Sequence, residues 1–187
     1  MRAAVFLDRD GTIVEDRGHL SRPEDVDFYP DAFPALRHLQ ERFVLFIVTN
    51  QNGVAKGLVS PGDVERVNAH VVARLAAEGI AVRAVYTCPH QRADGCPCIK
   101  PKPFFLKRAE EEHGIDLGAS WSVGDHPHDA DLARAVGGRG IFLLTGHGPK
   151  HRGEIAPGVP VAGGIAEAAD IILGKEGKGS SPASPPS

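Results

Sequence analysis

The stretch Phe6-Leu7-Asp8-Arg9-Asp10-Gly11-Thr12-Ile13 decides the fold and suggests the chemistry. It continues an apolar run from Ala3 that is typical of a β-strand. The run ends in two carboxylates at i and i+2, a spacing that points Asp8 and Asp10 the same way while Arg9 turns aside. Two adjacent carboxylates repel each other unless a cation or a shared proton lies between them. The alternative is an ordinary polar turn after a strand, and the Gly-Thr that follows makes it the weaker interpretation.

A hard divalent cation would neutralise this pair of carboxylates. Mg2+ fits, because it prefers a few oxygen ligands together with the oxygens of a phosphate. One carboxylate can then attack phosphorus while the other handles the proton of the leaving group. The sequence therefore predicts a phosphoryl-transfer site built around Asp8 and Asp10.

Length and composition fit one globular domain of 187 residues with 42% hydrophobic content. No apolar run approaches membrane-spanning length, and the net charge of -3 comes without a basic stripe, so we expect neither a membrane nor a nucleic-acid partner. Met1-Arg2 leads straight into the first strand and leaves no room for a signal peptide, so we expect a cytoplasmic protein. We also expect a monomer. Residues 1–174 form the predicted domain. Residues 175–187 are Lys, Gly, Ser and Pro for the most part, which predicts a disordered tail.

Apolar strands alternate with amphipathic helices along the chain. The run 43–48 is continuously apolar, which is typical of a central parallel strand covered on both faces. Such alternation predicts an α/β fold with an open, three-layer parallel sheet, whose ligands bind outside the carboxyl ends of the strands. The other predicted strands are 84–87, 121–125, 140–144 and an edge strand at 171–173, and the predicted helices are 61–78, 104–113, 129–136 and 165–169.

Three further polar groups follow predicted strands or lie in loops. Thr49, with the amides of Asn50 and Gln51, is placed to hold phosphate oxygens, although a threonine also simply suits a strand. Lys100 lies in a proline-rich loop and could neutralise a pentacoordinate phosphorus, although a solvated lysine is the commoner case. Asp125 ends a strand as Asp8 does, so it could complete an oxygen site with Asp8 and the main-chain carbonyl of Asp10. Asp129 begins the next helix, where an aspartate normally caps.

The three cysteines of the chain lie close together, in Cys88-Pro-His90 and Cys96-Pro-Cys98. Three thiolates and one imidazole can form a closed tetrahedral zinc site, so we predict a structural Zn2+. The alternatives are unpaired buried thiols or a disulfide, but a Cys96–Cys98 bridge would be strained and would leave one cysteine over. The zinc would hold the loop that carries Lys100.

Taken together, these motifs resemble the haloacid dehalogenase-like hydrolases. The matching residues, in the order of that superfamily, are Asp8-Arg9-Asp10-Gly11-Thr12, Thr49, Lys100, Gly124-Asp125 and Asp129. The resemblance implies a Rossmann-like core and Mg2+ bound by Asp8, Asp10 and Asp125. It further implies an aspartyl-phosphate on Asp8, with Asp10 as general acid and then base, and with Thr49 and Lys100 stabilising the phosphoryl group. Asp129 would support the site.

The zinc loop narrows the resemblance to the branch, without a large cap domain, that holds D-glycero-D-manno-heptose 1,7-bisphosphate phosphatases and histidinol-phosphate phosphatases. The stretches Asn50-Gln51-Asn52-Gly53-Val54-Ala55-Lys56-Gly57 and Val67-Asn68-Ala69-His70 favour the heptose enzymes, and Asp16-Arg17-Gly18-His19 matches their substrate-contacting segment. Two positions depart from the pattern. Ile99 stands where both groups usually have Arg, and His126 stands where the heptose enzymes usually have Lys.

These departures leave the reaction class intact and put the substrate in question. The expected substrate is a small phosphorylated metabolite, contacted by residues from four segments: Asp16, Arg17, His19, Asn50, Gln51, Asn52, Ile99 and His126. Arg17, His19 or His126 would then replace the lost cations, although the loop His126-Pro-His128 also reads as a polar loop tip and 16–19 as a solvated loop. We read 146–150 as a turn. The main hypothesis is a heptose bisphosphate 7-phosphatase. The alternatives are a histidinol-phosphate or other sugar-phosphate phosphatase and a non-catalytic, zinc-stabilised binding module.

Overall fold

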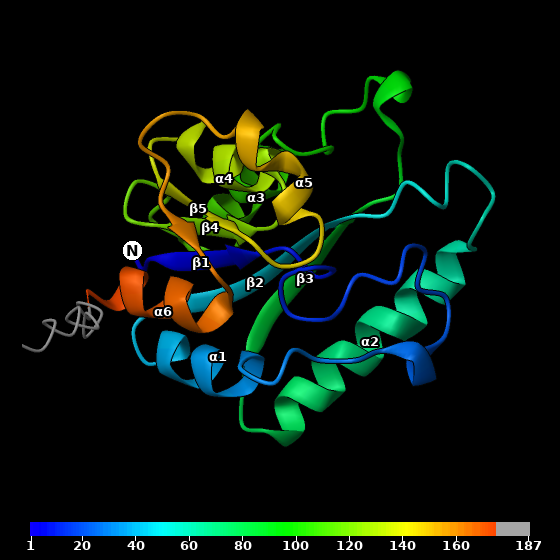
Figure 1. Cartoon of the computed structure of the whole chain (residues 1–187), viewed down its shortest axis with the longest axis horizontal. Coiled ribbons are helices and arrows are strands. Elements are labelled where there is room, and N and C mark those ends of the chain that lie inside the picture. The colour runs from blue at the N-terminus through cyan, green and yellow to red at the C-terminus, as the bar shows by residue number, and fades with distance from the viewer. Residues whose placement is uncertain (175–187) are drawn as a thin grey trace, which may run out of the picture.

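Six parallel strands form one sheet in the computed structural model, which describes residues 1–174 (Figure 1). The strand order is β3-β2-β1-β4-β5-β6. The strands are β1 (Ala4–Leu7), β2 (Val44–Asn50), β3 (Val82–Cys88), β4 (Trp121–Gly124), β5 (Arg139–Leu143) and β6 (Val161–Ala162). The strand that leads into Asp8 is therefore central, and the predicted parallel sheet is confirmed.

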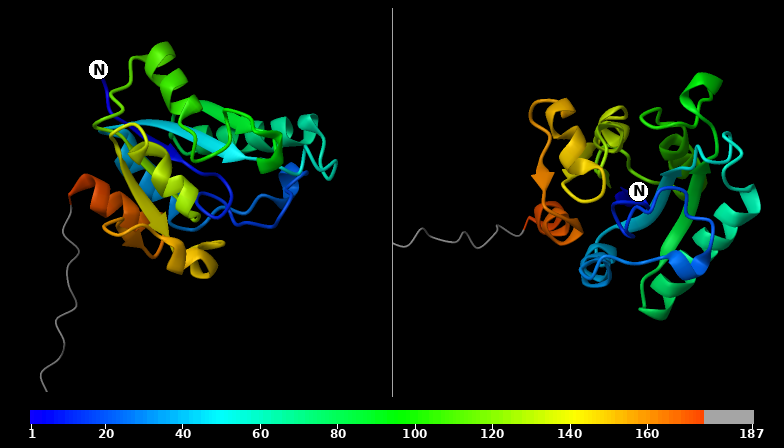
Figure 2. Two further views of the ribbon diagram at one scale, coloured as in Figure 1. Left: turned by 90° about the horizontal axis from the view of Figure 1, so that it is seen from above. Right: turned by 45° about the vertical axis from the view of Figure 1, so that its right-hand side comes forward.

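Helices cover both faces of the sheet (Figures 1 and 2). One face packs against α1 (Ala32–Gln40), α2 (Pro61–Ala77) and α6 (Ile165–Leu173), and the other against α3 (Phe104–His113) and α4 (Pro127–Arg134). The short helix α5 (Gly148–His151) follows β5. The result is the predicted three-layer architecture, and residues 1–174 contain no separate cap domain.

Alternation along β1 explains why its sequence is continuously apolar. Val5 and Leu7 are buried in the core under α1, α2 and α6, whereas Phe6 is buried in the core under α3 and α4. Phe6 stacks on Phe46 with ring centroids 5.1 Å apart, and the row of rings continues through Tyr86. A strand that is covered on both faces needs an apolar side chain at every position.

The structure differs from the sequence-based prediction at several elements. Residues 171–173 are not an edge strand, because Ile165, Ala168, Ala169 and Ile172 are buried at helical spacing and keep the whole segment in α6. The edge strand is the two-residue β6 instead. Helix α1 was not predicted; its buried residues repeat at helical spacing, but Pro34 interrupts the pattern in the first turn, where a helix tolerates proline.

Helix α4 begins at Pro127, two residues before the predicted start. The N-cap is His126, and Asp129 lies in the first turn as the partner in a capping box: its Oδ2 accepts from the backbone N–H of His126 at 3.0 Å. The turn predicted at 146–150 contains the first residues of α5.

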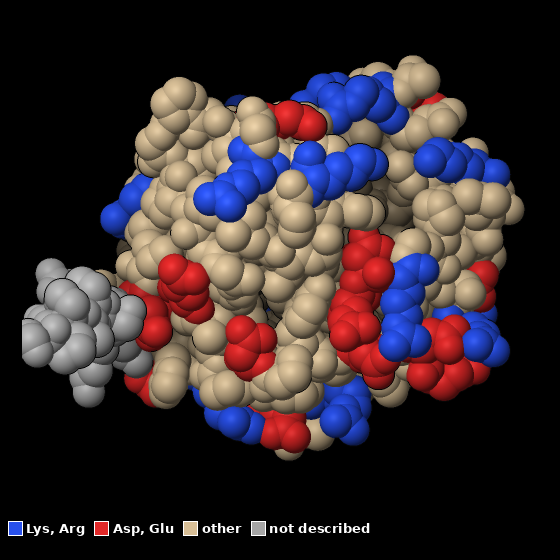
Figure 3. Space-filling view, in the orientation of Figure 1, with Lys and Arg blue, Asp and Glu red and all other residues tan. Residues whose placement is uncertain are grey.

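No helix within residues 1–174 is both long and apolar enough to cross a membrane. The face in Figure 3 carries acidic and basic side chains near one another, without one continuous basic stripe. The tail predicted at 175–187 lies outside the described residues.

Candidate active site

The carboxyl ends of the central strands bring the predicted catalytic residues to one cavity of about 480 Å3. Asp8 follows β1, Thr49 lies near the end of β2 and Asp125 follows β4. Lys100 reaches the same cavity from the loop between β3 and α3, and Asp129 reaches it from α4. Residues that are far apart in the sequence therefore meet at the edge of the sheet where ligands bind in such folds.

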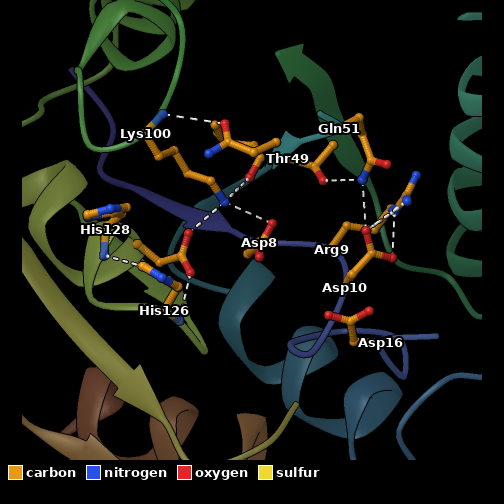
Figure 4. Close-up of polar contacts among 12 residues, drawn as sticks. Asp8, Arg9, Asp10, Asp16, Thr49, Gln51, Lys100, His126 and His128 are labelled. Atoms are coloured by element: carbon orange, nitrogen blue, oxygen red, sulfur yellow. Dashed lines mark hydrogen bonds and ion pairs between the residues drawn. The ribbon is translucent and has the colours of Figure 1, made fainter. Parts of the chain in front are cut away.

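Lys100 is the buried cation of the site. Its Nζ lies 2.8 Å from Asp8 Oδ1 and 2.5 Å from Asp129 Oδ1, and it donates to the carbonyl of Val48 at 3.0 Å (Figure 4). Burial alone would lower the pKa of Lys100, but Asp129 and Asp8 outweigh it and raise that pKa above its ordinary value. The side chain is therefore a fixed positive charge beside Asp8, which is the arrangement that a negatively charged transferring group requires.

Three carboxylates crowd around this lysine, of which Asp125 and Asp129 are buried and Asp8 is partly buried. Oxygen atoms of Asp8, Asp125 and Asp129 all lie within 4.8 Å of one another. Burial raises the pKa of Asp8 to about 6, with Lys100 opposing and Asp129 adding to the rise. Burial and then Asp8 raise the pKa of Asp125 to about 8. One lysine does not compensate three carboxylates, so the donor set fits a hard divalent cation such as Mg2+.

Two glycines leave the space that Asp125 occupies. Gly11 and Gly146 have positive φ angles of 77° and 49°, and a Cβ on either would collide with the Asp125 carboxylate. Oδ2 of Asp125 also accepts from the backbone N–H of His147 at 2.6 Å. The carboxylate is thus held by backbone from two loops.

Asp10 has different partners from Asp8. Its Oδ2 accepts from Gln51 Nε2 at 2.8 Å and from Arg9 Nη2, also at 2.8 Å (Figure 4). The same Gln51 amide group donates to Thr49 Oγ1 at 2.8 Å. Arg9 does not simply turn aside, as its backbone position suggested, because its long side chain reaches back to the neighbouring carboxylate.

Cys88, His90, Cys96 and Cys98 form a compact cluster. The sulfur atoms lie 3.2–3.6 Å apart, and His90 Nδ1 lies 3.3 Å from Cys98 Sγ and 3.8 Å from Cys88 Sγ. A disulfide would need about 2.05 Å, and all three cysteines are free. Tetrahedral bonds of about 2.3 Å to zinc separate sulfur ligands by about 3.8 Å, so the cluster is compatible with one zinc ion.

The cavity gathers most of the predicted substrate-binding residues. Its lining includes Asp16, His19, Asn50, Gln51, Asn52, Ile99 and His126. Arg17 does not line it, because its guanidinium pairs with the carboxylate of Asp27 on the surface. Burial, then His128 and His151, lower the pKa of His126 to about 4, so the ring is neutral near pH 7 and does not replace a lost cation.

Four residues that line the cavity had no site role assigned from the sequence, and one of them, His128, was interpreted as part of a polar loop tip. Lys56 and Arg92 contribute positive charge, and His128 and His147 contribute imidazoles. Arg92 contacts the His128 ring. The position of Arg92 between two predicted zinc ligands, His90 and Cys96, was a usable signal, since a fixed loop can present a cation to the site. Arg9 gave no such signal, because its partners are set by the tertiary structure.

Comparisons with known proteins identify relatives of the chain. A family model described as HAD-hydrolase-like matches residues 97–168. The chain is 38% identical over 135 residues to a probable D-glycero-D-manno-heptose-1,7-bisphosphate 7-phosphatase of Thermoplasma acidophilum, covering 71% of this chain and 84% of the relative. It is 32% identical to the D-glycero-beta-D-manno-heptose-1,7-bisphosphate 7-phosphatase of Pseudomonas aeruginosa, covering 92% of this chain and 98% of that enzyme.

Solved structures show the same relationship. The D,D-heptose 1,7-bisphosphate phosphatase of B. bronchiseptica, in complex with magnesium and phosphate, has a TM-score of 0.84 and 29% identity, covering 93% of this chain and 99% of the other. The enzyme of the same name from Burkholderia thailandensis has a TM-score of 0.71 and 25% identity, covering 93% and 100%. On its sequence identity to these relatives and on the shared fold, the chain belongs to the haloacid dehalogenase-like hydrolases, in the branch of the heptose-1,7-bisphosphate phosphatases.

Proposed function

We propose that this phosphatase removes the 7-phosphate of D-glycero-D-manno-heptose 1,7-bisphosphate through an aspartyl-phosphate on Asp8. The observation that carries the proposal is the contact between Asp8 and the buried Lys100, which lie 2.8 Å apart in the cavity. Relatives of the chain are named for this reaction. Relatives are named for the beta and for the alpha substrate, so the proposal covers both anomers.

In the first step, a carboxylate oxygen of Asp8 attacks phosphorus and the bond from phosphorus to the sugar oxygen breaks. Asp10 gives its proton to that oxygen, and the sugar leaves as an alcohol. In the second step, water attacks the phosphorus of the aspartyl-phosphate while Asp10 takes a proton, which frees phosphate and restores Asp8. Lys100 and the Thr49 hydroxyl hold the phosphoryl oxygens in both steps.

Metals would support these steps. Asp8, the main-chain carbonyl of Asp10, and Asp125 would hold Mg2+, which when bound supplies positive charge that lets the phosphate approach the carboxylates. Asp129 would remain with Lys100, its partner at 2.5 Å, and so keep the lysine in place. Zn2+ on the Cys88–Cys98 cluster would be structural, because four protein ligands leave no open position.

The second phosphate of the substrate would be bound at the rim of the same cavity. Arg92 and Lys56 line it, and neither side chain has a carboxylate within ion-pair distance among residues 1–174. Both cations are thus free to contact the second phosphate in place of the arginine that usually stands at the position of Ile99. His19, Asn50 and Asn52 would contact the sugar, with Asp16 and Gln51 nearby. A cytoplasmic location and a monomeric state remain predictions.

A substrate panel tests the proposal. Purified protein with Mg2+ is given heptose 1,7-bisphosphate, heptose 7-phosphate, histidinol phosphate and simple sugar monophosphates, and released phosphate is measured beside the Asp8→Asn variant. We expect the highest kcat/KM for the bisphosphate and a loss of several orders of magnitude in Asp8→Asn. A strong preference for histidinol phosphate would overturn the substrate assignment, and hydrolysis that persists in Asp8→Asn would overturn the mechanism.

A further inference from the structure

Arg9 is the bulkiest fully buried side chain of residues 1–174, with 1% of its surface exposed, and the steps above give it no part. Its guanidinium lies against the carboxyl group of Asp10. Nε donates to Oδ1 at 3.1 Å and to Oδ2 at 3.2 Å, and Nη2 donates to Oδ2 at 2.8 Å (Figure 4). Arg9 is thus paired with Asp10, the residue to which we assign proton transfer.

The other end of the guanidinium is held from outside the catalytic cavity. Arg9 Nη1 donates to Asn68 Oδ1 on α2 at 2.7 Å. Asn68 Nδ2 is bonded in turn to Thr87 Oγ1 on β3 at 3.0 Å. Because arginine can only donate, Asn68 must present its carbonyl oxygen to Arg9, and the contact with Thr87 keeps the amide in that orientation. Asn68 and Thr87 line an apolar groove that shares no lining residue with the catalytic cavity.

This connection restricts where Arg9 can lie. A buried guanidinium has a high cost unless its N–H groups have acceptors, and Asp10 is its one carboxylate partner among the described residues. With Asn68 on one side and Asp10 on the other, the planar group has two fixed attachments rather than one.

The two oxygens of Asp10 are consequently unequal. Oδ2 accepts from Arg9 Nη2 and from Gln51 Nε2, whereas Oδ1 has neither of these donors, and the single Nε–H of Arg9 is shared between the two oxygens. Oδ1 is therefore the oxygen with room for a proton. We infer that Arg9 and Asn68 are positioning residues, which fix the Asp10 carboxyl group so that Oδ1 delivers the proton to the departing sugar oxygen. The inference rests on the proposed function, because it takes Asp10 as the general acid.

The basicity of the leaving group provides the test. A sugar phosphate releases a strongly basic alkoxide unless an acid protonates it, whereas p-nitrophenyl phosphate releases a stable anion and needs little help. The ratio kcat/KM reports the chemistry up to release of the leaving group, so it isolates the step in which Asp10 gives its proton. Both substrates are assayed with Asn68→Ala, Thr87→Val and, as a control, Val72→Ala, which removes volume from the same groove but no hydrogen-bond partner of Arg9.

General acid catalysis contributes about 10²–10⁴-fold. We expect Asn68→Ala to lower kcat/KM for the sugar phosphate by about tenfold or more, and for p-nitrophenyl phosphate by less than about twofold. Thr87→Val should act in the same direction with a smaller effect, and Val72→Ala should lower neither selectively. An equal loss for both substrates in Asn68→Ala would mean that the residue is merely structural, and no loss for either would mean that Asp10 needs no such support. Both results overturn the inference.

Asp10→Asn separates this inference from the proposed function. If Asp10→Asn lowers kcat/KM far more for the sugar phosphate than for p-nitrophenyl phosphate, the role of Asp10 stands, and Asn68→Ala alone decides the inference. If Asp10→Asn shows no dependence on the leaving group, the proposed general acid is wrong, and the inference falls with it.

Discussion

Replacing Lys100 with methionine would remove the one positive charge within residues 1–174 that forms an ion pair with Asp8 and with the buried Asp129. Lys100 is 5% exposed, and its Nζ lies 2.8 Å and 2.5 Å from the two carboxylates, so Lys100→Met leaves buried negative charge without its partner. Removing one member of a buried ion pair costs about 3–5 kcal/mol. In a chain of this size about 1 kcal/mol shifts the Tm by about 2–4 °C, so we expect the Tm to fall by about 6–20 °C near pH 8.

The loss should depend on pH in a defined direction. Burial already raises the pKa of Asp8 to about 6 in the wild type, although Lys100 opposes that rise. In Lys100→Met this opposition is gone, so the folded protein holds the Asp8 proton to higher pH than the unfolded chain does. Stability must then fall as the pH rises from about 4 through the folded-state pKa. The difference in Tm between variant and wild type should therefore be smaller at pH 5 than at pH 8.

Thermal unfolding in magnesium-free buffer, with zinc retained, measures both effects. Lys107→Met is the matched control, because Lys107 is exposed on α3 and such a surface change is expected to alter stability by less than about 0.5 kcal/mol. A loss that is equal at pH 5 and pH 8, or no larger than that of Lys107→Met, would refute the electrostatic account of this lysine.

Three further predictions concern the metals and the substrate. Magnesium-free wild type should lose stability between pH 5 and pH 8, because the raised pKa values of Asp8 and Asp125 make the folded state bind more protons than the unfolded state. Mg2+ should therefore raise the Tm more at pH 8 than at pH 5. An equal shift of the Tm by Mg2+ at both pH values would contradict this. Elemental analysis should find about one zinc per chain, and Cys96→Ser should lower both the Tm and the activity; unchanged stability in a zinc-free preparation would argue against a structural zinc. Arg92→Ala should lower kcat/KM for the bisphosphate by about tenfold or more, as expected for a charge-assisted contact of about 1.5–3 kcal/mol, with little effect on monophosphates. Adding Ile99→Arg to that variant should restore part of the loss. Equal effects of Arg92→Ala on both substrate types would mean that the second phosphate binds elsewhere.

The catalytic end of the sheet could be located from sequence because strand ends carry local signals. Asp8 and Asp125 each follow an apolar strand directly, and parallel strands end at the same edge, so their meeting follows from the fold class. Lys100 could be assigned through its place in the motif order of the superfamily that the chain resembles, because a lysine in a proline-rich loop is by itself more often solvated. For Asp8 and Asp125, short-range sequence and a simple topological rule carry the information.

Other features depend on packing across long stretches of chain. Residues 171–173 read locally as a strand, but burial of one helical face on each turn against the core makes them part of α6. Arg9 and Asn68 lie 59 residues apart, and their contact depends on the path of a long side chain. Arg92 enters the cavity only because the Cys/His loop folds back on itself. Neither the contact between Arg9 and Asn68 nor the place of Arg92 in the cavity leaves a periodic pattern in the sequence.

The most direct test of the account is to trap the phosphoryl group on Asp8. Enzyme is mixed with Mg2+ and a stoichiometric amount of heptose bisphosphate, quenched in acid during the first turnover, digested and analysed by mass spectrometry. The account predicts that the peptide containing Asp8 gains the mass of one phosphoryl group, that the gain disappears as turnover completes, and that Asp8→Asn never shows it. Release of phosphate in a full first turnover with no label on Asp8 at any time, or a label on another residue, would contradict the account.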